Sequence, residues 1–187
     1  MEIIIGIIGI IIGLLISIIP YFRNKYIHRP EITMEIKSDG GMSLQMGLSS
    51  KNELNKDGNI DGNNAIRIFE LTWLLRVKIT NNSEFTAFYP ELEFNPNGPK
   101  LKIDNLNRLQ PIKPAESIEL SASYKKYEEA RGIDRTQTGE GPPVEFKELE
   151  LLLGYENSKK RRFYTLFDFS SNDKRNIFLR KRPKYFA

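Results

Sequence analysis

An uninterrupted apolar run at the N-terminus constrains this chain more than any other feature. Residues Ile3 to Ile19 carry no charge and no polar side chain apart from Ser17. At about 1.5 Å per residue they give roughly 26 Å of helix, and the next three residues extend it toward the roughly 30 Å hydrocarbon thickness of a bilayer. The sequence therefore predicts one transmembrane helix over residues 1–22, followed by a basic linker over residues 23–30.

The same run has three other interpretations. A cleaved secretory signal begins with a basic residue and ends in a small-residue site, whereas this run begins with Glu2 and ends at Ile18-Ile19-Pro20-Tyr21. A buried core helix would need protein around every face of a segment built largely of isoleucine. The run also resembles a type IV pilin stalk in its early acidic residue, its apolar helix and its proline, but the basic leader is missing. We favour the transmembrane interpretation.

The charges that flank the run predict its orientation. Glu2 is the only charge before it, while Arg23, Lys25, His28 and Arg29 follow it closely. Basic residues stay on the cytoplasmic side of a membrane, so we expect a single-pass inner-membrane protein with its N-terminus outside and its C-terminal domain in the cytoplasm. Arg23, Lys25 and Arg29 would then lie at the membrane surface, within reach of anionic lipid headgroups.

Small residues recur along one side of the predicted helix. They are Gly6, Gly9, Gly13 and Ser17. In lipid no hydrophobic drive holds helices together, so close backbone approach over small residues is what allows them to associate. The stripe predicts helix self-association and hence a homo-oligomer, although glycine is also simply common in membrane helices.

Composition excludes most catalytic chemistry. Without the anchor, about 160 of the 187 residues remain, which is enough for one domain with its own core. The chain has no cysteine and a single histidine, His28. Disulfides, thiolate catalysis, histidine triads and multi-histidine metal sites are therefore excluded within one chain. We expect no enzyme activity and no cofactor.

Alternating apolar and polar residues predict strands throughout the rest of the chain. Residues 31–37 read as a first strand. Phe69 to Ile79 gives the strongest signal, because every second residue from Phe69 onward is apolar. Residues 84–94 return as the next strand, and Pro90 predicts an edge position or a bulge.

Two long segments mostly lack this pattern, and a final hairpin follows them. The exception is a brief strand-like alternation of Met42, Leu44, Met46 and Leu48. We expect residues 38–64 to form mostly a mobile loop and residues 125–143 a flexible polar loop with one helical turn near Tyr127 to Arg131. Leu149, Leu151, Leu153 and Tyr155 should face Phe163, Thr165, Phe167 and Phe169 in a hairpin whose cross-strand pairs fix the register.

Seven or eight short strands predict an all-β domain over residues 31–171, ahead of a basic tail over residues 172–187. The expected fold is an antiparallel β-sandwich or a small β-barrel. The Pro114-Ala-Glu-Ser turn before a strand, together with Val77 to Ser83, resembles immunoglobulin-like bacterial domains. That resemblance covers about fifty residues and implies an immunoglobulin-like sandwich.

One loop begins like a calcium site. Asp57, Asn59 and Asp61 follow the D-x-N-x-D-G spacing that places oxygen ligands around a hard cation. The twelfth position, where a bidentate glutamate should close the cage, is Ile68, and no helix flanks the loop. Asn and Asp before glycine are also typical of tight turns, which is the interpretation we favour.

The composition and layout together predict a membrane-tethered, non-enzymatic binding or signalling module. Its loops carry the basic residues that we expect to contact a protein partner or a small ligand such as a nucleotide. These are Lys125, Lys126, Arg131, Arg135, Lys159, Lys160, Arg161 and Arg162. The interleaved basic and aromatic residues of the tail suit lipid better than a nucleic acid polymer.

A short membrane segment joined to a small β-domain resembles the membrane effectors of bacterial anti-phage systems that respond to cyclic oligonucleotides. The resemblance implies that the β-domain senses a nucleotide while the helices assemble to disrupt the inner membrane. It is one of architecture alone, so no site residue follows from it. The alternative is an envelope structural or pilin-like assembly protein whose β-domain lies outside the cytoplasm.

Overall fold

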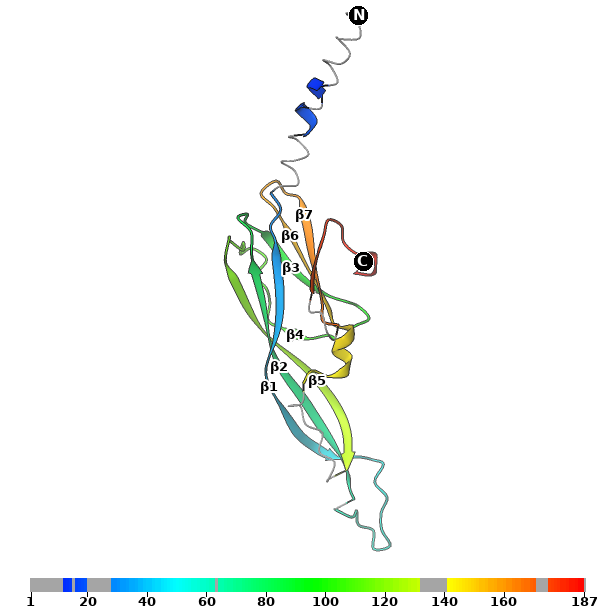
Figure 1. Cartoon of the computed structure of the whole chain (residues 1–187). Coiled ribbons are helices and arrows are strands. Elements are labelled where there is room, and N and C mark those ends of the chain that lie inside the picture. Colours follow the sequence, from blue (N-terminus) through cyan, green and yellow to red (C-terminus); the bar gives the residue numbers. More distant parts are fainter. Residues whose placement is uncertain are drawn as a thin grey trace, which may run out of the picture.

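Eight antiparallel strands form two sheets in the part of the chain that the structure describes (Figure 1). The computed structural model describes residues 12–14, 16–19, 28–62, 64–131, 141–170 and 175–186. The first sheet has the order β1-β2-β5-β4, made by β1 (Ile32–Leu48), β2 (Ile66–Asn81), β5 (Ser117–Arg131) and β4 (Lys102–Ile103). The second has the order β3-β6-β7-β8, made by β3 (Phe88–Phe94), β6 (Glu150–Glu156), β7 (Arg162–Asp168) and β8 (Arg175–Leu179). Two short 3₁₀ helices, η2 (Val144–Glu148) and η3 (Lys184–Phe186), lie beside the second sheet's strands in the sequence.

The two sheets share one hydrophobic core, as the alternating pattern predicted. The alternate apolar residues of β2 are all buried, namely Phe69, Leu71, Trp73, Leu75, Val77 and Ile79, whereas Leu74 on the other face is exposed. The hairpin of β6 and β7 also has the predicted register, because Leu151 pairs with Phe167 and Tyr155 with Phe163. Pro90 lies in the irregular part of edge strand β3, as expected. An all-β domain is therefore confirmed.

Two segments that we expected to be loops are strands. β1 continues through the first half of residues 38–64 as far as Leu48, and β5 continues through residues 125–131 without a helical turn. The β1 part has the brief alternation of Met42, Leu44, Met46 and Leu48, whereas residues 125–131 have no alternating apolar pattern. Both segments pair with the long central strand β2. Lys125 Nζ and Tyr127 Oη of β5 each donate a hydrogen bond to the Glu70 carboxylate of β2, at 2.6 and 2.7 Å.

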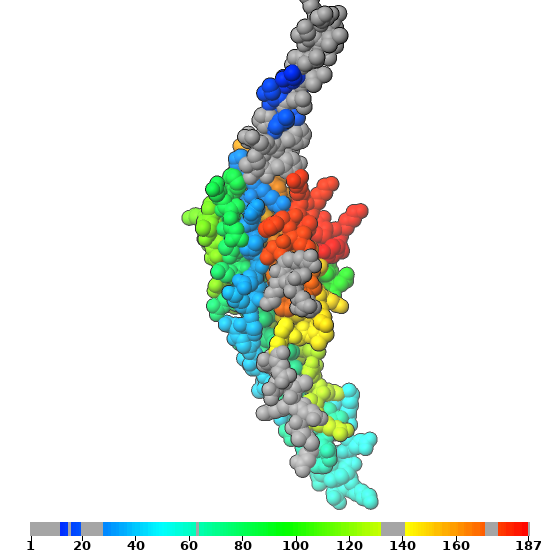
Figure 2. Space-filling view, viewed as in Figure 1, coloured from blue at the N-terminus to red at the C-terminus, as the bar shows by residue number. Residues whose placement is uncertain are grey.

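The molecule is elongated because β1, β2 and β5 run far beyond the second sheet. Figure 1 shows these strands reaching a loop, residues 49–65, at the opposite end from the turn between β6 and β7, and Figure 2 shows the same narrow distal part. We call residues 40–48, 66–74 and 123–131 the blade, and the loop at its end the tip. A strand of 16 residues such as β2 is about 50 Å long.

The outer edge of β1 differs along its length. Near its start, the Asn176 side-chain amide mimics a neighbouring strand. Asn176 Oδ1 accepts a hydrogen bond from the Met34 N–H at 2.7 Å, while its Nδ2 donates to the Met34 carbonyl at 3.0 Å. Thr165 Oγ1 also donates to the Ile32 carbonyl at 2.9 Å. In the blade, no described strand pairs with this edge.

Most of the predicted transmembrane segment lies outside the described residues. Among them are Gly6, Gly9, Arg23 and Lys25. Residues 12–14 and 16–19 are helical, and Ser17 Oγ donates a hydrogen bond to the Gly13 carbonyl at 2.9 Å. Among the described residues no helix has both the length and the apolar character needed to cross a membrane.

Candidate functional site

A mainly apolar pocket lies where the blade leaves the second sheet. It has a volume of about 300 Å³. One wall comes from Ile36 and Ser38 of β1 with Trp73 and Leu75 of β2. The other comes from the segment around η2, residues 141–147, and from Phe169 after β7. The pocket therefore joins segments about seventy residues or more apart in the sequence.

Aromatic rings form a continuous series beside this pocket. Ring centroids lie 5.8 Å apart for Trp73 and Tyr124, 5.2 Å for Tyr124 and Phe146, and 5.4 Å for Phe146 and Phe169. Phe146 is 1% exposed, so it anchors η2 in the core. Such tilted and edge-on contacts hold rings rigidly and leave a preformed apolar surface.

The polar groups of the pocket are few. Trp73 Nε1 donates a hydrogen bond to the Gly141 carbonyl at 3.2 Å, which fixes the indole ring against the segment before η2. The Ser38 hydroxyl and the Lys147 ammonium are the polar side chains of the described lining, and both residues are exposed. Lys147 forms no ion pair with any residue that the structure describes.

Charges next to the pocket neutralise one another. Lys126 Nζ lies 2.6 Å from Glu145 and 3.0 Å from Glu128. These contacts, that with Glu145 first, raise the pKa of Lys126, and Lys126 in turn lowers the pKa of Glu145. Burial raises the pKa of Tyr124. Lys147 is therefore the cation beside this pocket that has no carboxylate partner in the described chain.

The lining is suited to apolar contact with a small molecule. No carboxylate or histidine is part of the described lining. Pockets of this size and character typically hold a small molecule by apolar contact, with a few polar groups setting its orientation. Aromatic walls and one unpaired cation suit a planar group that bears negative charge.

The predicted basic residues do not form one site. Lys125 is paired with Glu70 on the outer face of the blade, whereas Lys126 is paired with Glu145 and Glu128 beside the pocket. Arg131 is the last residue of the blade and lines the hollow beside the tip, and Arg135 lies outside the described residues. Lys159, Lys160, Arg161 and Arg162 lie together around the β6–β7 turn at the opposite end of the molecule (Figure 1). Arg162 is paired there with Glu91.

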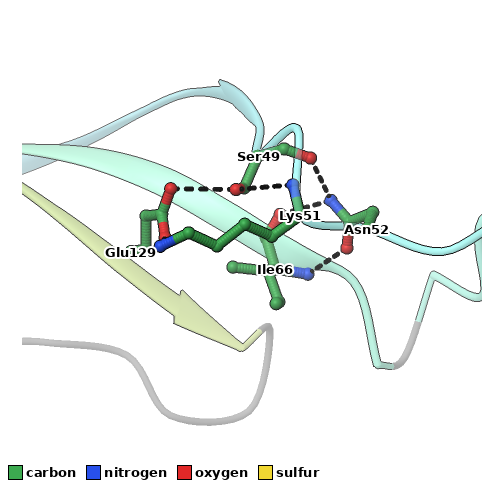
Figure 3. A network of polar contacts seen from close by, with 5 residues as sticks. All are labelled: Ser49, Lys51, Asn52, Ile66 and Glu129. Atoms are coloured by element: carbon green, nitrogen blue, oxygen red, sulfur yellow. Dashed lines mark hydrogen bonds and ion pairs between the residues drawn. The ribbon is translucent and has the colours of Figure 1, made fainter.

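The tip is held by an asparagine clasp and an ion pair (Figure 3). Asn52 Oδ1 accepts a hydrogen bond from the Ile66 N–H at 2.6 Å, and its Nδ2 donates to the Ile66 carbonyl at 2.8 Å. Glu129 accepts hydrogen bonds from Ser49 Oγ at 2.9 Å and from Lys51 Nζ. The hollow of about 580 Å³ beside this network is wide and mostly polar. Its polar groups largely satisfy one another, so it ranks below the aromatic pocket as a site.

The calcium-like residues form turns. Asn55 Oδ1 accepts hydrogen bonds from the backbone N–H groups of Asp57 and Asn59, at 3.0 and 2.8 Å. The Asp61 carboxylate accepts one from Asn64 Nδ2 at 2.7 Å. In the part of the chain that the structure describes, no three acidic or histidine side chains gather into a possible metal site. These contacts favour the turn interpretation.

Arg29 packs into the domain. Its guanidinium lies 5.3 Å from the ring centroids of both Phe163 and Phe178. Its Nη2 is also 3.4 Å from the carbonyls of Tyr164 and Leu179, to which it donates. The side chain that we expected at the membrane surface thus connects β7 and β8.

The pocket itself was missed in the sequence because its walls are distant along the chain. Trp73 was assigned only to the core face of β2, and the 141–147 segment to a loop and the start of a strand. Pro142-Pro143, which fixes the chain before η2, was the available signal. The chain matches no protein-family model, no curated protein and no solved structure.

Proposed function

We propose that this chain is a non-enzymatic binding module whose aromatic pocket takes a small, planar, negatively charged ligand such as a nucleotide. The N-terminal apolar run tethers the module to the inner membrane, and its basic flank keeps the domain on the cytoplasmic side. The single observation that carries the proposal is the pocket wall of Trp73 and Phe146 with the unpaired Lys147 at its side.

The finer fold assignment belongs to the same proposal. Two separate four-stranded sheets around one core support a β-sandwich rather than a barrel. An immunoglobulin-like sandwich with extended strands would place the ligand at the junction with the blade. Helix association through the small-residue stripe would make the full chain an oligomer, as in the anti-phage effectors that its layout resembles.

Fluorescence of Trp73 tests whether a nucleotide binds in the pocket, because Trp73 is the chain's single tryptophan and lines the pocket. The full chain in detergent is titrated with linear and cyclic adenine and guanine nucleotides. We expect a saturable change in emission for at least one of them. Lys147→Glu should weaken that binding about tenfold or more, by replacing attraction with repulsion, as a loss of about 1.4 kcal/mol or more implies.

The matched control is Lys113→Glu, which makes the same charge change at an exposed site outside the pocket lining. It should bind the nucleotide as the original chain does. Two results would contradict the proposal: no nucleotide changes the emission, or both lysine variants weaken binding equally.

One observation favours the assembly alternative. From Gly40 to Leu48 the blade edge of β1 carries no charge, and Met42, Leu44 and Met46 are each more than half exposed. Unpaired strand edges of this kind accept another strand. Protease accessibility of the C-terminal domain in intact cells distinguishes the two functions, because the assembly protein exposes it outside the cytoplasm.

A further inference from the structure

The end of the domain nearest the N-terminal run carries basic side chains that the pocket does not use. The β6–β7 turn lies at this end, since Asn157 Nδ2 donates a hydrogen bond to the His28 carbonyl at 3.1 Å. Asn157 is 2% exposed, and its Oδ1 accepts hydrogen bonds from the N–H groups of Lys159 and Arg161 at 2.9 and 3.0 Å. The buried amide thus fixes the turn against the point where the chain enters the domain.

The end of β8 brings further basic residues to the same place. Leu179 pairs with Tyr164 near the start of β7, so Arg180 and Lys181 follow at the end that holds the β6–β7 turn. Arg29 ties the two strands together there through its contacts with the Tyr164 and Leu179 carbonyls. We call Lys159, Lys160, Arg180 and Lys181 the basic end.

All four side chains of the basic end are exposed. Lys159, Lys160 and Lys181 form no ion pair within the described parts of the chain. They are therefore available to an outside anion, unlike Lys125 and Lys126 of the blade, whose charges carboxylates already neutralise.

The charge at this end is one-sided. Carboxylates gather where the first sheet ends, because the Glu31 and Glu116 carbonyls accept hydrogen bonds from the Asn82 and Asn81 N–H groups, and Glu84 follows in the same turn. Lys113 adds one positive charge beside Glu116 on that side. On the second sheet, Glu156 ends β6 next to the turn, but the four residues of the basic end outnumber it. An anionic surface would attract the second-sheet side and repel the first-sheet side, which gives the domain a preferred tilt.

We propose that the basic end binds the anionic headgroups of the bilayer in which the N-terminal run is anchored, and that this contact sets the tilt of the β-domain. The inference rests on the tether of the proposed function and adds a second, electrostatic contact to it. Basic residues attract anionic lipid only within a few ångströms to a Debye length. This end is the one that the chain enters at His28, nine residues after the last residue of the apolar run, Ile19. Lys159 and Lys160 therefore act as lipid contacts instead of the ligand contacts that their sequence predicted.

A single label tests the contact in the full chain. Since the chain has no cysteine, Ser158→Cys in the β6–β7 turn provides one site for an environment-sensitive fluorophore. The labelled chain is placed in nanodiscs that carry headgroup-level quencher lipid. The bilayer is either phosphatidylcholine alone or a mixture with phosphatidylglycerol. We expect quenching to be at least twofold stronger with phosphatidylglycerol and to fall to the phosphatidylcholine level at high salt.

Charge reversal tests which lysines contact the anionic lipid. The triple variant Lys159→Glu, Lys160→Glu, Lys181→Glu should lose the extra quenching. The control triple Lys56→Glu, Lys100→Glu, Lys102→Glu changes net charge equally at exposed sites away from this end and should keep it. Equal quenching in both bilayers, or equal loss in both triples, overturns the inference.

Failure of the inference and failure of the tether give different results. A chain that does not co-migrate with nanodiscs of either composition has no membrane anchor, and the tether of the proposed function falls. A chain that co-migrates with both, while its quenching ignores lipid charge, keeps the tether and loses the lipid contact of the basic end.

Discussion

The first sheet uses the same three strands along its whole length, but its two halves are stabilised by different means. Near the N-terminal end, Ile32, Val77 and Leu120 pack against Leu151 and Tyr155 of the second sheet. In the blade, Phe69, Leu71 and Trp73 form a small separate cluster on one face, while the other face carries exposed Met42 and Leu44. Burial between the two sheets stabilises the N-terminal half of the first sheet. The blade is stabilised largely because its three strands continue from that half.

The two strand edges of the blade differ in the same way. β5 ends in Lys-Lys-Tyr-Glu-Glu-Ala-Arg, so charged side chains protect this edge. Lys125, Lys126, Glu128 and Glu129 form ion pairs with one another or with residues of β2, η2 and the tip. β1 has no charge from Gly40 to Leu48. Charged residues keep stray strands away from an edge. The difference means that the blade is closed to new strands on one side and open on the other.

Matched leucine truncations in the shared core and in the blade should give the largest effects on stability. Leu153→Ala removes a fully buried side chain from the shared core and should lower the free energy of unfolding by about 3 to 5 kcal/mol. Leu71→Ala makes the same change in the blade and should cost less, about 2 kcal/mol, because a single sheet relaxes more easily around the gap. Urea unfolding of the full chain measures both. Equal losses would show that the two halves are equally well packed.

The sequence predicted the shared core better than it predicted the blade. Alternation from Phe69 to Ile79, and in the β6–β7 hairpin, is local, and it correctly indicated which side chains meet in the core. The blade half of β1 carries only a brief alternation at Met42, Leu44, Met46 and Leu48, and that of β5 carries none. Their structure depends on pairing with β2, from which Arg131 is separated by 65 residues at its partner Ile66. The pocket was missed for the same reason, because Trp73 meets Gly141 only after folding.

Asn176 and Asn52 each bind the N–H and the carbonyl of one strand residue, Asn176 near the core and Asn52 at the tip. Asn176→Ala leaves the N–H and carbonyl of buried Met34 without their partners and should cost about 2 kcal/mol of global stability. Asn52→Ala removes the same pair of hydrogen bonds from Ile66 at the tip, where opening is local. Hydrogen exchange should therefore quicken across both sheets in the first variant and only around the tip in the second. Exchange confined to Met34 in Asn176→Ala would contradict the expectation.

The unguarded edge of β1 gives a prediction about association rather than folding. Leu44→Lys places a charge on an exposed position of that edge, so stability should change by less than about 0.5 kcal/mol. Self-association of the purified full chain, followed by light scattering against concentration, should fall. Lys125→Met removes a guard from the β5 edge and should raise it. If neither variant alters scattering, neither blade edge takes part in association.

The smallest expected effect is that of acid on the blade and the tip. Lys125, and then Tyr127, lower the pKa of Glu70, while Lys51 and then Ser49 lower the pKa of Glu129. A carboxyl group whose folded pKa lies below its ordinary value of 4.5 stabilises the fold above that value. The contribution is lost as the pH falls from 4.5 through the lowered pKa. NMR titration should show small structural changes at the tip in this window, and Glu129→Gln should abolish those near Lys51.

The length of β2 has a mechanical consequence. A pull between the N-terminal end and the tip acts along the strands, while the hydrogen bonds between β1 and β2 run across them from Ile32–Asn81 to Leu48–Arg67. Because β1 itself runs from one loaded end to the other, its extended backbone carries this load, and the hydrogen bonds to β2 keep that strand straight. The molecule should therefore behave as a stiff rod under tension, and transmit force from whatever the tip holds to the segment that enters at its other end.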